Sequence, residues 1–106
     1  MEFLVQIEVK MPADMPDATR VALVAAEHAR GRQLCDDGTI RAVWRIPGRF
    51  ANCAIWSAPD ATRLHEAISS LPLWRYIAVS VTPLARHELG PTCPGLPSGL
   101  VVEANP

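Results

Sequence analysis

One glutamate in the chain stands where an acidic side chain is unexpected. At about 100° per residue along a helix, Glu27 falls in the middle of an apolar stripe. The residues that share this stripe are Leu23, Val24, Gly31 and Leu34. Burial disfavours the charged form of a carboxylate, so Glu27 must either be paired with a cation or have a raised pKa. The first case is a structural ion pair with an arginine at the core edge, and the second provides a general base.

A second group of polar side chains shares one face of a predicted hairpin. Residues 38–56 read as two strands closed by a Pro47-Gly48 turn, because proline presets the backbone and glycine accepts the positive φ that often follows. On this face the guanidiniums of Arg41 and Arg45 and the amide of Asn52 could together hold a carboxylate. The alternative interpretation is a solvated face, or a face that contacts another subunit.

The pairing of the hairpin decides which side chains share a face. A two-residue loop pairs Arg45 with Phe50. The face opposite the arginines then has the composition of a core and carries Ile40, Ala42, Trp44, Ile46, Ala51, Cys53 and Ile55. Trp44 and Trp56 fall on opposite faces, so at most one of them lines a given cavity unless it lies at an edge. The sequence leaves open which face meets the helices.

The other reactive side chains show no catalytic or metal-binding spacing. His28 follows Glu27 but points about 100° further round the helix, so spacing alone does not make them a catalytic pair. His65 lies beside Leu64 and is typical of a structural histidine. The sequence contains no His-x-x-x-His pair, Cys–His cluster, glycine-rich phosphate loop or serine elbow. We therefore predict neither a metal nor a cofactor.

Composition indicates one ordinary globular domain. The 106 residues carry a formal net charge of −1 and 49% of them are hydrophobic, which suits a single modest core. This charge balance gives no electrostatic footprint for nucleic acid or an anionic membrane surface. The sequence shows no membrane-spanning run and no signal peptide, and its three cysteines have no metal spacing. We therefore expect a cytoplasmic protein with reduced thiols.

Alternating and helical patterns predict the order β-α-β-β-α-β. The first predicted element is a strand with Phe3, Val5, Ile7 and Val9 inward, and it is followed by a helix from about Ala18 to Asp36, with Asp17 as N-cap and Gly38 after its end. After the hairpin come a helix that is capped by Asp60 and runs to about Ser70, and a last strand from Tyr76 to Leu84. This is the α+β ferredoxin-like arrangement, a four-stranded antiparallel sheet with two helices on one face. The uncovered face is partly apolar, so we expect a homo-oligomer.

The C-terminal end departs from this pattern. Residues 1–87 form the predicted folded domain, and residues 88–106 form a tail whose prolines and glycines exclude regular structure. The tail is interpreted either as a mobile segment or as an arm that contacts another subunit.

Several short motifs agree in order and spacing with one enzyme family. They are Val9-Lys10-x-Pro12-x-Asp14-Met15, Glu27, Gly38-Thr39, Trp44-Arg45-Ile46-x-Gly48-x-Phe50-Ala51-Asn52, Leu71-Pro72-Leu73 and Tyr76. On these residues the chain resembles the muconolactone Δ-isomerase family over about residues 1–87. The resemblance implies a small ferredoxin-like protein of the dimeric α+β barrel type, assembled as a decamer and using no cofactor. It also implies the conversion of muconolactone to 3-oxoadipate enol-lactone in the β-ketoadipate pathway of aromatic catabolism.

The implied reaction suits the candidate residues. Muconolactone is a small lactone with a free carboxylate, and its allylic shift needs one base that moves a proton between the carbons α and γ to the lactone carbonyl. We expect Glu27 to be this base, and Arg41 or Arg45 to hold the substrate carboxylate. Asn52 or a backbone amide would stabilise the dienolate oxygen, and Trp44 would line the substrate site.

The chain also departs from the pattern that the resemblance leads us to expect, which leaves its substrate open. Residues 21–26 are rich in Ala and Val, and Ile40, Ala42 and Cys53 are small or apolar, which would widen a pocket between helix and sheet. One alternative is therefore a related cofactor-free cyclase or monooxygenase that acts on a bulkier aromatic or polyketide. The other is a non-catalytic binding protein, which predicts no deep cavity near Glu27.

Overall fold

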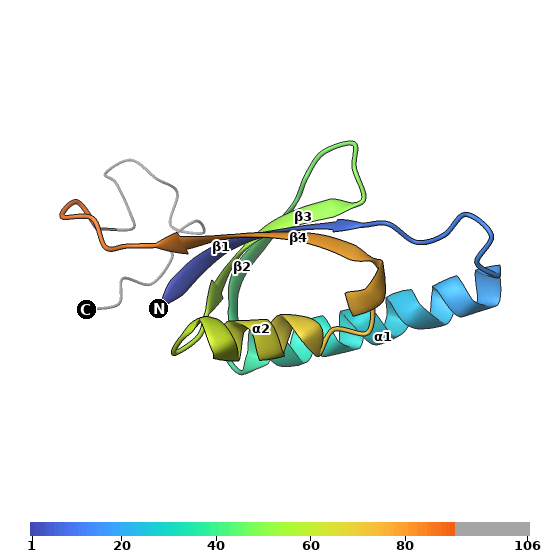
Figure 1. Ribbon diagram of the computed structural model, residues 1–106, viewed down its shortest axis with the longest axis horizontal. Coiled ribbons are helices and arrows are strands. Elements are labelled where there is room, and N and C mark those ends of the chain that lie inside the picture. The colour runs from blue at the N-terminus through green and yellow to red at the C-terminus, as the bar shows by residue number, and fades with distance from the viewer. Residues whose placement is uncertain (91–106) are drawn as a thin grey trace.

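In the described part of the chain, the two α-helices lie on one side of a four-stranded sheet (Figure 1). The computed structural model describes residues 1–90, and the predicted C-terminal arm lies largely outside the described residues. The elements are β1 (Glu2–Val9), α1 (Asp17–Asp36), β2 (Ile40–Arg45), β3 (Ala51–Ser57), α2 (Ala61–Ser69), a 3-10 helix (Trp74–Tyr76) and β4 (Ile77–Leu84). The strands pair antiparallel in the order β2-β3-β1-β4. The predicted ferredoxin-like arrangement is confirmed.

The core lies between the sheet and the helices. Phe3, Val5 and Ile7 of β1 are buried and alternate with more exposed residues, because successive side chains of a strand point to opposite faces. The other buried members of this cluster are Leu34, Ala54, Trp56, Ala58, Leu64, Ile68 and Leu71. The inward pattern predicted for β1 is therefore the pattern that builds the core.

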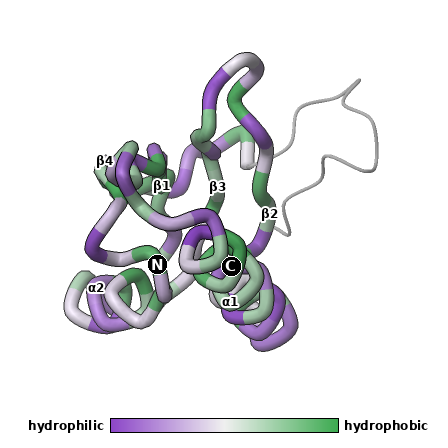
Figure 2. Tube along the Cα trace, turned by 90° about the vertical axis from the view of Figure 1, so that its right-hand side faces the viewer, coloured by the Kyte–Doolittle hydropathy of each residue, from purple (hydrophilic) through white to green (hydrophobic). Residues whose placement is uncertain are grey.

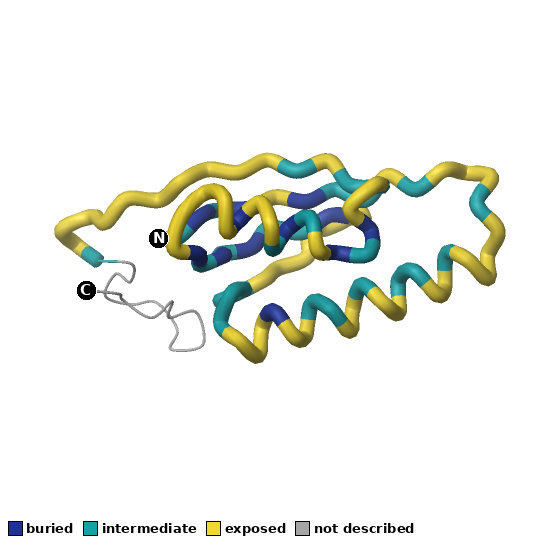
Figure 3. Tube along the Cα trace, turned by 60° about the horizontal axis from the view of Figure 1, so that its bottom comes forward, coloured by how far each residue is buried: buried dark blue, intermediate teal, exposed yellow. Residues whose placement is uncertain are grey.

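The two helices contribute unequally to this core. α2 presents Leu64 and Ile68, one turn apart, whereas Leu34 is the buried residue among the 20 residues of α1. Viewed end-on, α1 and α2 lie side by side beneath the sheet (Figure 2), and α1 is the more exposed along its length (Figure 3). α1 is thus anchored near its C-terminal end, which leaves room between its middle and the sheet.

The helix ends follow the predicted residues with one exception. Asp60 caps α2, and its Oδ1 accepts a hydrogen bond from the amide of Arg63 at 2.8 Å. Gly38 follows α1 with a φ of +84°, a left-handed conformation that suits glycine. The prediction of Asp17 as the N-cap of α1 is wrong. Pro16 takes that position without a side-chain cap, and Asp17 instead places its negative charge in the first turn, at the positive end of the helix dipole.

The hairpin between β2 and β3 has a longer turn than predicted. Arg45 lies opposite Asn52 rather than opposite Phe50. The amide of Ile46 donates to the carbonyl of Ala51 at 3.1 Å and closes the turn. The pairing has therefore moved by two residues. Because side chains alternate with a period of two, the predicted faces survive this change.

A bulge at the start of β2 changes which sheet face its first residue lies on, compared with the prediction. Ile40 lies opposite Trp56 and Ala42 lies opposite Ile55, so Arg41 is the extra residue between them. Ile40 therefore packs against the core, on the helix side of the sheet.

The helices cover the face that carries the polar residues of the hairpin. Ala54 and Trp56 belong to the core, and Arg45 and Asn52 share their face. The interpretation of the opposite face as a core is wrong, because that face, with Trp44 exposed, has no helix over it. The covered face can hold polar groups because it borders a cavity as well as the core.

Candidate active site

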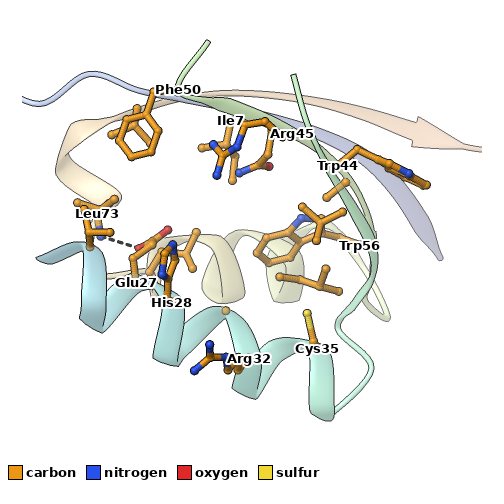
Figure 4. Close-up of a pocket in the computed structure, with 18 residues that line it drawn as sticks. Ile7, Glu27, His28, Arg32, Cys35, Trp44, Arg45, Phe50, Trp56 and Leu73 are labelled. Carbon is orange, nitrogen blue, oxygen red and sulfur yellow. Dashed lines mark hydrogen bonds between the residues drawn. The ribbon is translucent and has the colours of Figure 1, made fainter. Parts of the chain in front are cut away.

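A cavity of about 480 Å³ lies between α1 and the sheet (Figure 4). Its apolar wall is formed by Ile7, Val9, Val24, Ile40, Val43, Phe50, Ala54, Trp56, Leu71 and Leu73. Its polar and titratable lining residues are Glu27, His28, Arg32, Cys35, Arg45 and Asn52. A mostly apolar hollow with a few convergent polar groups is typical of a site for a small molecule. The binding-protein alternative predicted no deep cavity near Glu27, and this prediction is wrong.

Glu27 points from the middle of α1 into this cavity. Its Oε1 accepts a hydrogen bond from the backbone amide of Leu73 at 3.0 Å. Burial raises the pKa of Glu27 above its ordinary value, while the Leu73 amide and the nearby charge of His28 act in the opposite direction. Among the described residues the carboxylate forms no ion pair with an arginine, so the structural ion pair is not formed there.

The helical stripe explains how α1 presents this carboxylate. Leu34 is buried two turns after Glu27 and fixes the rotation of the helix against the core. Gly31 lies between them and also lines the cavity, and a Cβ atom at Gly31 would meet no atom within 4 Å. The glycine therefore leaves space open beside the carboxylate.

Arg45 faces Glu27 from the opposite wall. Figure 4 shows Glu27 and His28 on the helix and Arg45 on the sheet pointing toward the same hollow. The guanidinium carbon of Arg45 lies 5.6 Å from the ring centroid of Phe50, and its Nη1 donates to the carbonyl of Ala51 at 3.4 Å. The aromatic face and the carbonyl hold a positive charge at the cavity wall.

The structure brings together only part of the predicted site. Glu27, Arg45 and Asn52 line one cavity. Trp44 touches the cavity at the edge strand, is 42% exposed, and directs its indole away from the hollow (Figure 4). Arg41 occupies the bulge and is not among the cavity-lining residues.

Three contributors to the site are absent from the sequence prediction. His28 lines the cavity beside Glu27, although a position 100° round the helix argued against this. The amide of Leu73 comes from a turn after α2, and no side-chain pattern indicates a backbone donor. Trp56 is 2% exposed at the cavity wall, and within residues 1–90 its indole N–H has no hydrogen-bond partner. The Leu71-Pro72-Leu73 motif, which carries part of the family resemblance, lies at this turn.

The described part of the chain offers neither a metal site nor a membrane-spanning helix. Residues 1–90 contain no group of three or more His, Cys, Asp or Glu side chains placed to hold a metal ion. No helix in the same range is long and apolar enough to cross a membrane.

Comparison with known proteins assigns this chain to a family. The family model described as muconolactone delta-isomerase matches residues 1–89. The chain belongs to the muconolactone delta-isomerase family. A muconolactone delta-isomerase of Cupriavidus pinatubonensis is 38% identical over 87 residues, which cover 82% of this chain and 95% of that protein. Muconolactone delta-isomerase 2 of Acinetobacter lwoffii is 41% identical over 88 residues, which cover 82% of this chain and 91% of that protein.

Solved structures agree with this membership of the isomerase family. A crystal structure of muconolactone isomerase superposes with a TM-score of 0.81 at 35% identity and covers 88% of this chain and 97% of its own. A 5-chloro-2-hydroxyhydroquinone dehydrochlorinase from Burkholderia phenoliruptrix has a TM-score of 0.62 at 17% identity, and the match covers 83% of this chain and 97% of that chain. At this identity the likeness shows a shared fold alone.

Proposed function

We propose that this protein is a muconolactone delta-isomerase that works without a cofactor. It moves the ring C=C bond of muconolactone and so forms 3-oxoadipate enol-lactone. The observation that carries the proposal is the Glu27 carboxylate, whose pKa is raised by burial and which faces an apolar cavity opposite a cationic side chain. The family membership of the chain supports the same reaction.

The reaction needs one group that first accepts and then returns a proton. The Glu27 carboxylate takes the proton from the ring carbon γ to the lactone carbonyl, and the C=C bond shifts as negative charge moves to the carbonyl oxygen. The resulting carboxylic acid then protonates the α carbon and regenerates the carboxylate. Oε1 of Glu27 is held by the Leu73 amide, so we assign the proton transfers to Oε2.

The opposite wall supplies binding and charge stabilisation. Arg45 pairs with the free carboxylate of the substrate, since a guanidinium presents two parallel donors to a carboxylate. The amide of Asn52 donates to the lactone carbonyl oxygen, where negative charge develops. Trp44 contributes the edge of the cavity, and Arg41 is left outside the proposed site.

We also propose that the protein is a cytoplasmic homo-oligomer, a decamer by resemblance to its family. The sheet face away from the helices supports an assembly, because Trp44 and Leu84 expose large apolar side chains there. The native mass of the full chain, measured by light scattering, tests the decamer.

The proposed activity is tested by direct assay. The purified full chain is incubated with muconolactone, and the enol-lactone is followed by NMR, with an aromatic polyketide and a bulky phenol as competing candidate substrates. Turnover of muconolactone with kcat/KM above about 10⁴ M⁻¹s⁻¹ is expected for an enzyme on its own substrate. No turnover of muconolactone, together with turnover of a bulkier compound, would replace the proposal with the cyclase or monooxygenase alternative.

A further inference from the structure

Two consecutive titratable side chains share the cavity. Glu27 and His28 both belong to its lining, and Figure 4 shows them side by side on the sheet-facing side of α1. The imidazole is exposed, whereas the carboxylate is half-buried. His28 is therefore the more solvent-exposed of two neighbouring titratable groups at one cavity.

The charged and titratable groups around Glu27 come from two elements. α1 contributes His28, Arg32 and Cys35 to the cavity lining, and β2 contributes Arg45. The lining residues of β1, β3 and the turn after α2 are apolar or carry an amide, and the Leu73 N–H is the donor that reaches the carboxylate. Of the four side chains, His28 is the one whose charge lowers the pKa of Glu27, against the effect of burial.

We propose that His28 is a positioning residue for the isomerase reaction: its imidazolium, adjacent to the cavity carboxylate, keeps Glu27 in the ionised form that can accept a proton. This inference rests on the proposed function, and it adds a residue that contacts no reacting atom.

The sign of the effect follows from the two charges. A positive imidazolium stabilises the carboxylate more than the carboxylic acid, so removing the positive charge makes Glu27 hold its proton to a higher pH. The base form is then lost earlier as the solution is acidified. The acid limb of the kcat/KM profile must therefore move to higher pH when His28 is made neutral.

The experiment compares four proteins over the same pH range. His28→Gln removes the charge, His28→Lys keeps it, and His65→Gln is the matched control, because His65 packs edge-on against Trp74 and lines no part of the cavity. With muconolactone as the substrate, His28→Gln is expected to move the midpoint of the acid limb up by roughly 0.5 pH unit, a small shift because His28 is exposed and screened. The His28→Lys and wild-type midpoints should agree, and the His65→Gln midpoint should not move.

Ionic strength gives a second readout that a packing role would not affect. Raising salt from about 0.05 to about 0.5 M should move the wild-type midpoint toward that of His28→Gln, and should move the His28→Gln midpoint less. Coincident acid limbs of wild type and His28→Gln would overturn the inference. So would a raised KM in His28→Gln with an unmoved limb, because this would assign the imidazole to the substrate carboxylate.

A measurement without substrate separates this inference from the proposed function. The side-chain carboxyl carbon of Glu27, labelled with ¹³C, is titrated by NMR in wild type and His28→Gln. If wild type does not turn over muconolactone, the proposed function fails, yet a higher Glu27 midpoint in His28→Gln would still support the role of His28. Equal midpoints in the two proteins would overturn that role whether or not the enzyme is active.

Discussion

The backbone amide of Leu73 donates a hydrogen bond to Oε1 of Glu27 across 46 residues of sequence. The bond joins the turn after α2 to the middle of α1, and it fixes one oxygen of the carboxylate while the other remains available. A fixed carboxylate needs little reorganisation during proton transfer. The turn after α2 thus takes part in the site without supplying a functional side chain.

Replacing Glu27 with Gln should abolish most of the activity while keeping the fold. Gln has nearly the same shape and its oxygen can still accept from the Leu73 amide, but it cannot take up a proton. We expect kcat with muconolactone to fall by about 10²–10⁴-fold, the usual contribution of a positioned base. Steady-state kinetics measure the loss, and unchanged circular dichroism provides the control. A variant that keeps near-full activity would refute Glu27 as the base.

The same variant should be more stable than wild type at neutral pH. The folded-state pKa of Glu27 is raised by burial, so the folded protein holds the proton more tightly than the unfolded chain. The stability this gives is fully present below the unfolded pKa and is lost as pH rises through the folded pKa.

Urea unfolding of wild type and Glu27→Gln at several pH values checks this prediction. At a pH above both the unfolded-state and the folded-state pKa of Glu27, the unfolding free energy of the variant should exceed that of wild type. This difference should shrink as the pH falls below both pKa values. A pH-independent difference would mean that the proton on Glu27 is not linked to folding.

Arg45 is expected to act on binding more than on chemistry. Replacing it with Met keeps the apolar stem but removes the donors for the substrate carboxylate. A hydrogen bond to a charged group is worth about 1.5–3 kcal/mol, so KM for muconolactone should rise by roughly 10- to 100-fold with a smaller change in kcat.

Arg49→Met is the matched control, because Arg49 pairs with Glu8 and does not line the cavity. Its kinetic constants should remain close to those of wild type. An equal rise of KM in both variants would point to a general loss of positive charge rather than to a specific contact.

Two substitutions at Gly31 should separate its effect on helix stability from its effect on the cavity. Replacing it with Ala should raise the unfolding free energy by about 0.5–1 kcal/mol, because a Cβ there meets no atom within 4 Å and alanine is the better helix former. Replacing it with Leu should fill space beside Glu27 and raise KM for muconolactone without unfolding the protein. Thermal denaturation and steady-state kinetics of the two variants measure these effects, and a destabilised Ala variant would contradict the first.

The sequence predicts well those structural features that depend on the spacing of residues close together along the chain. The alternation in β1 and the cap at Asp60 each involve neighbours within a few residues, and each is present in the structure. Of the predicted stripe around Glu27, Leu34 is buried in the core, and Val24 and Gly31 line the cavity. Glu27 could therefore be selected, and its surroundings anticipated, without any knowledge of the fold.

Features set by distant contacts could not be predicted in this way. The turn between Arg45 and Asn52 and the bulge at Arg41 depend on how β2 fits β3. The covered face of the sheet depends on where both helices pack. The approach of Leu73 to Glu27 depends on the same packing, and no spacing in the sequence encodes it.

The hairpin limits where this enzyme can vary in length. Because Arg45 and Trp44 are neighbours in one strand, sliding β2 by a single position would send the cation outward and bring the indole into the cavity. Residues can be added or lost within the loop between residues 45 and 52, because the pairing of Arg45 with Asn52 does not depend on the number of residues between them. A single residue inserted within β2 instead turns its side chains over, so related chains with such an insertion should carry a second bulge that restores the faces.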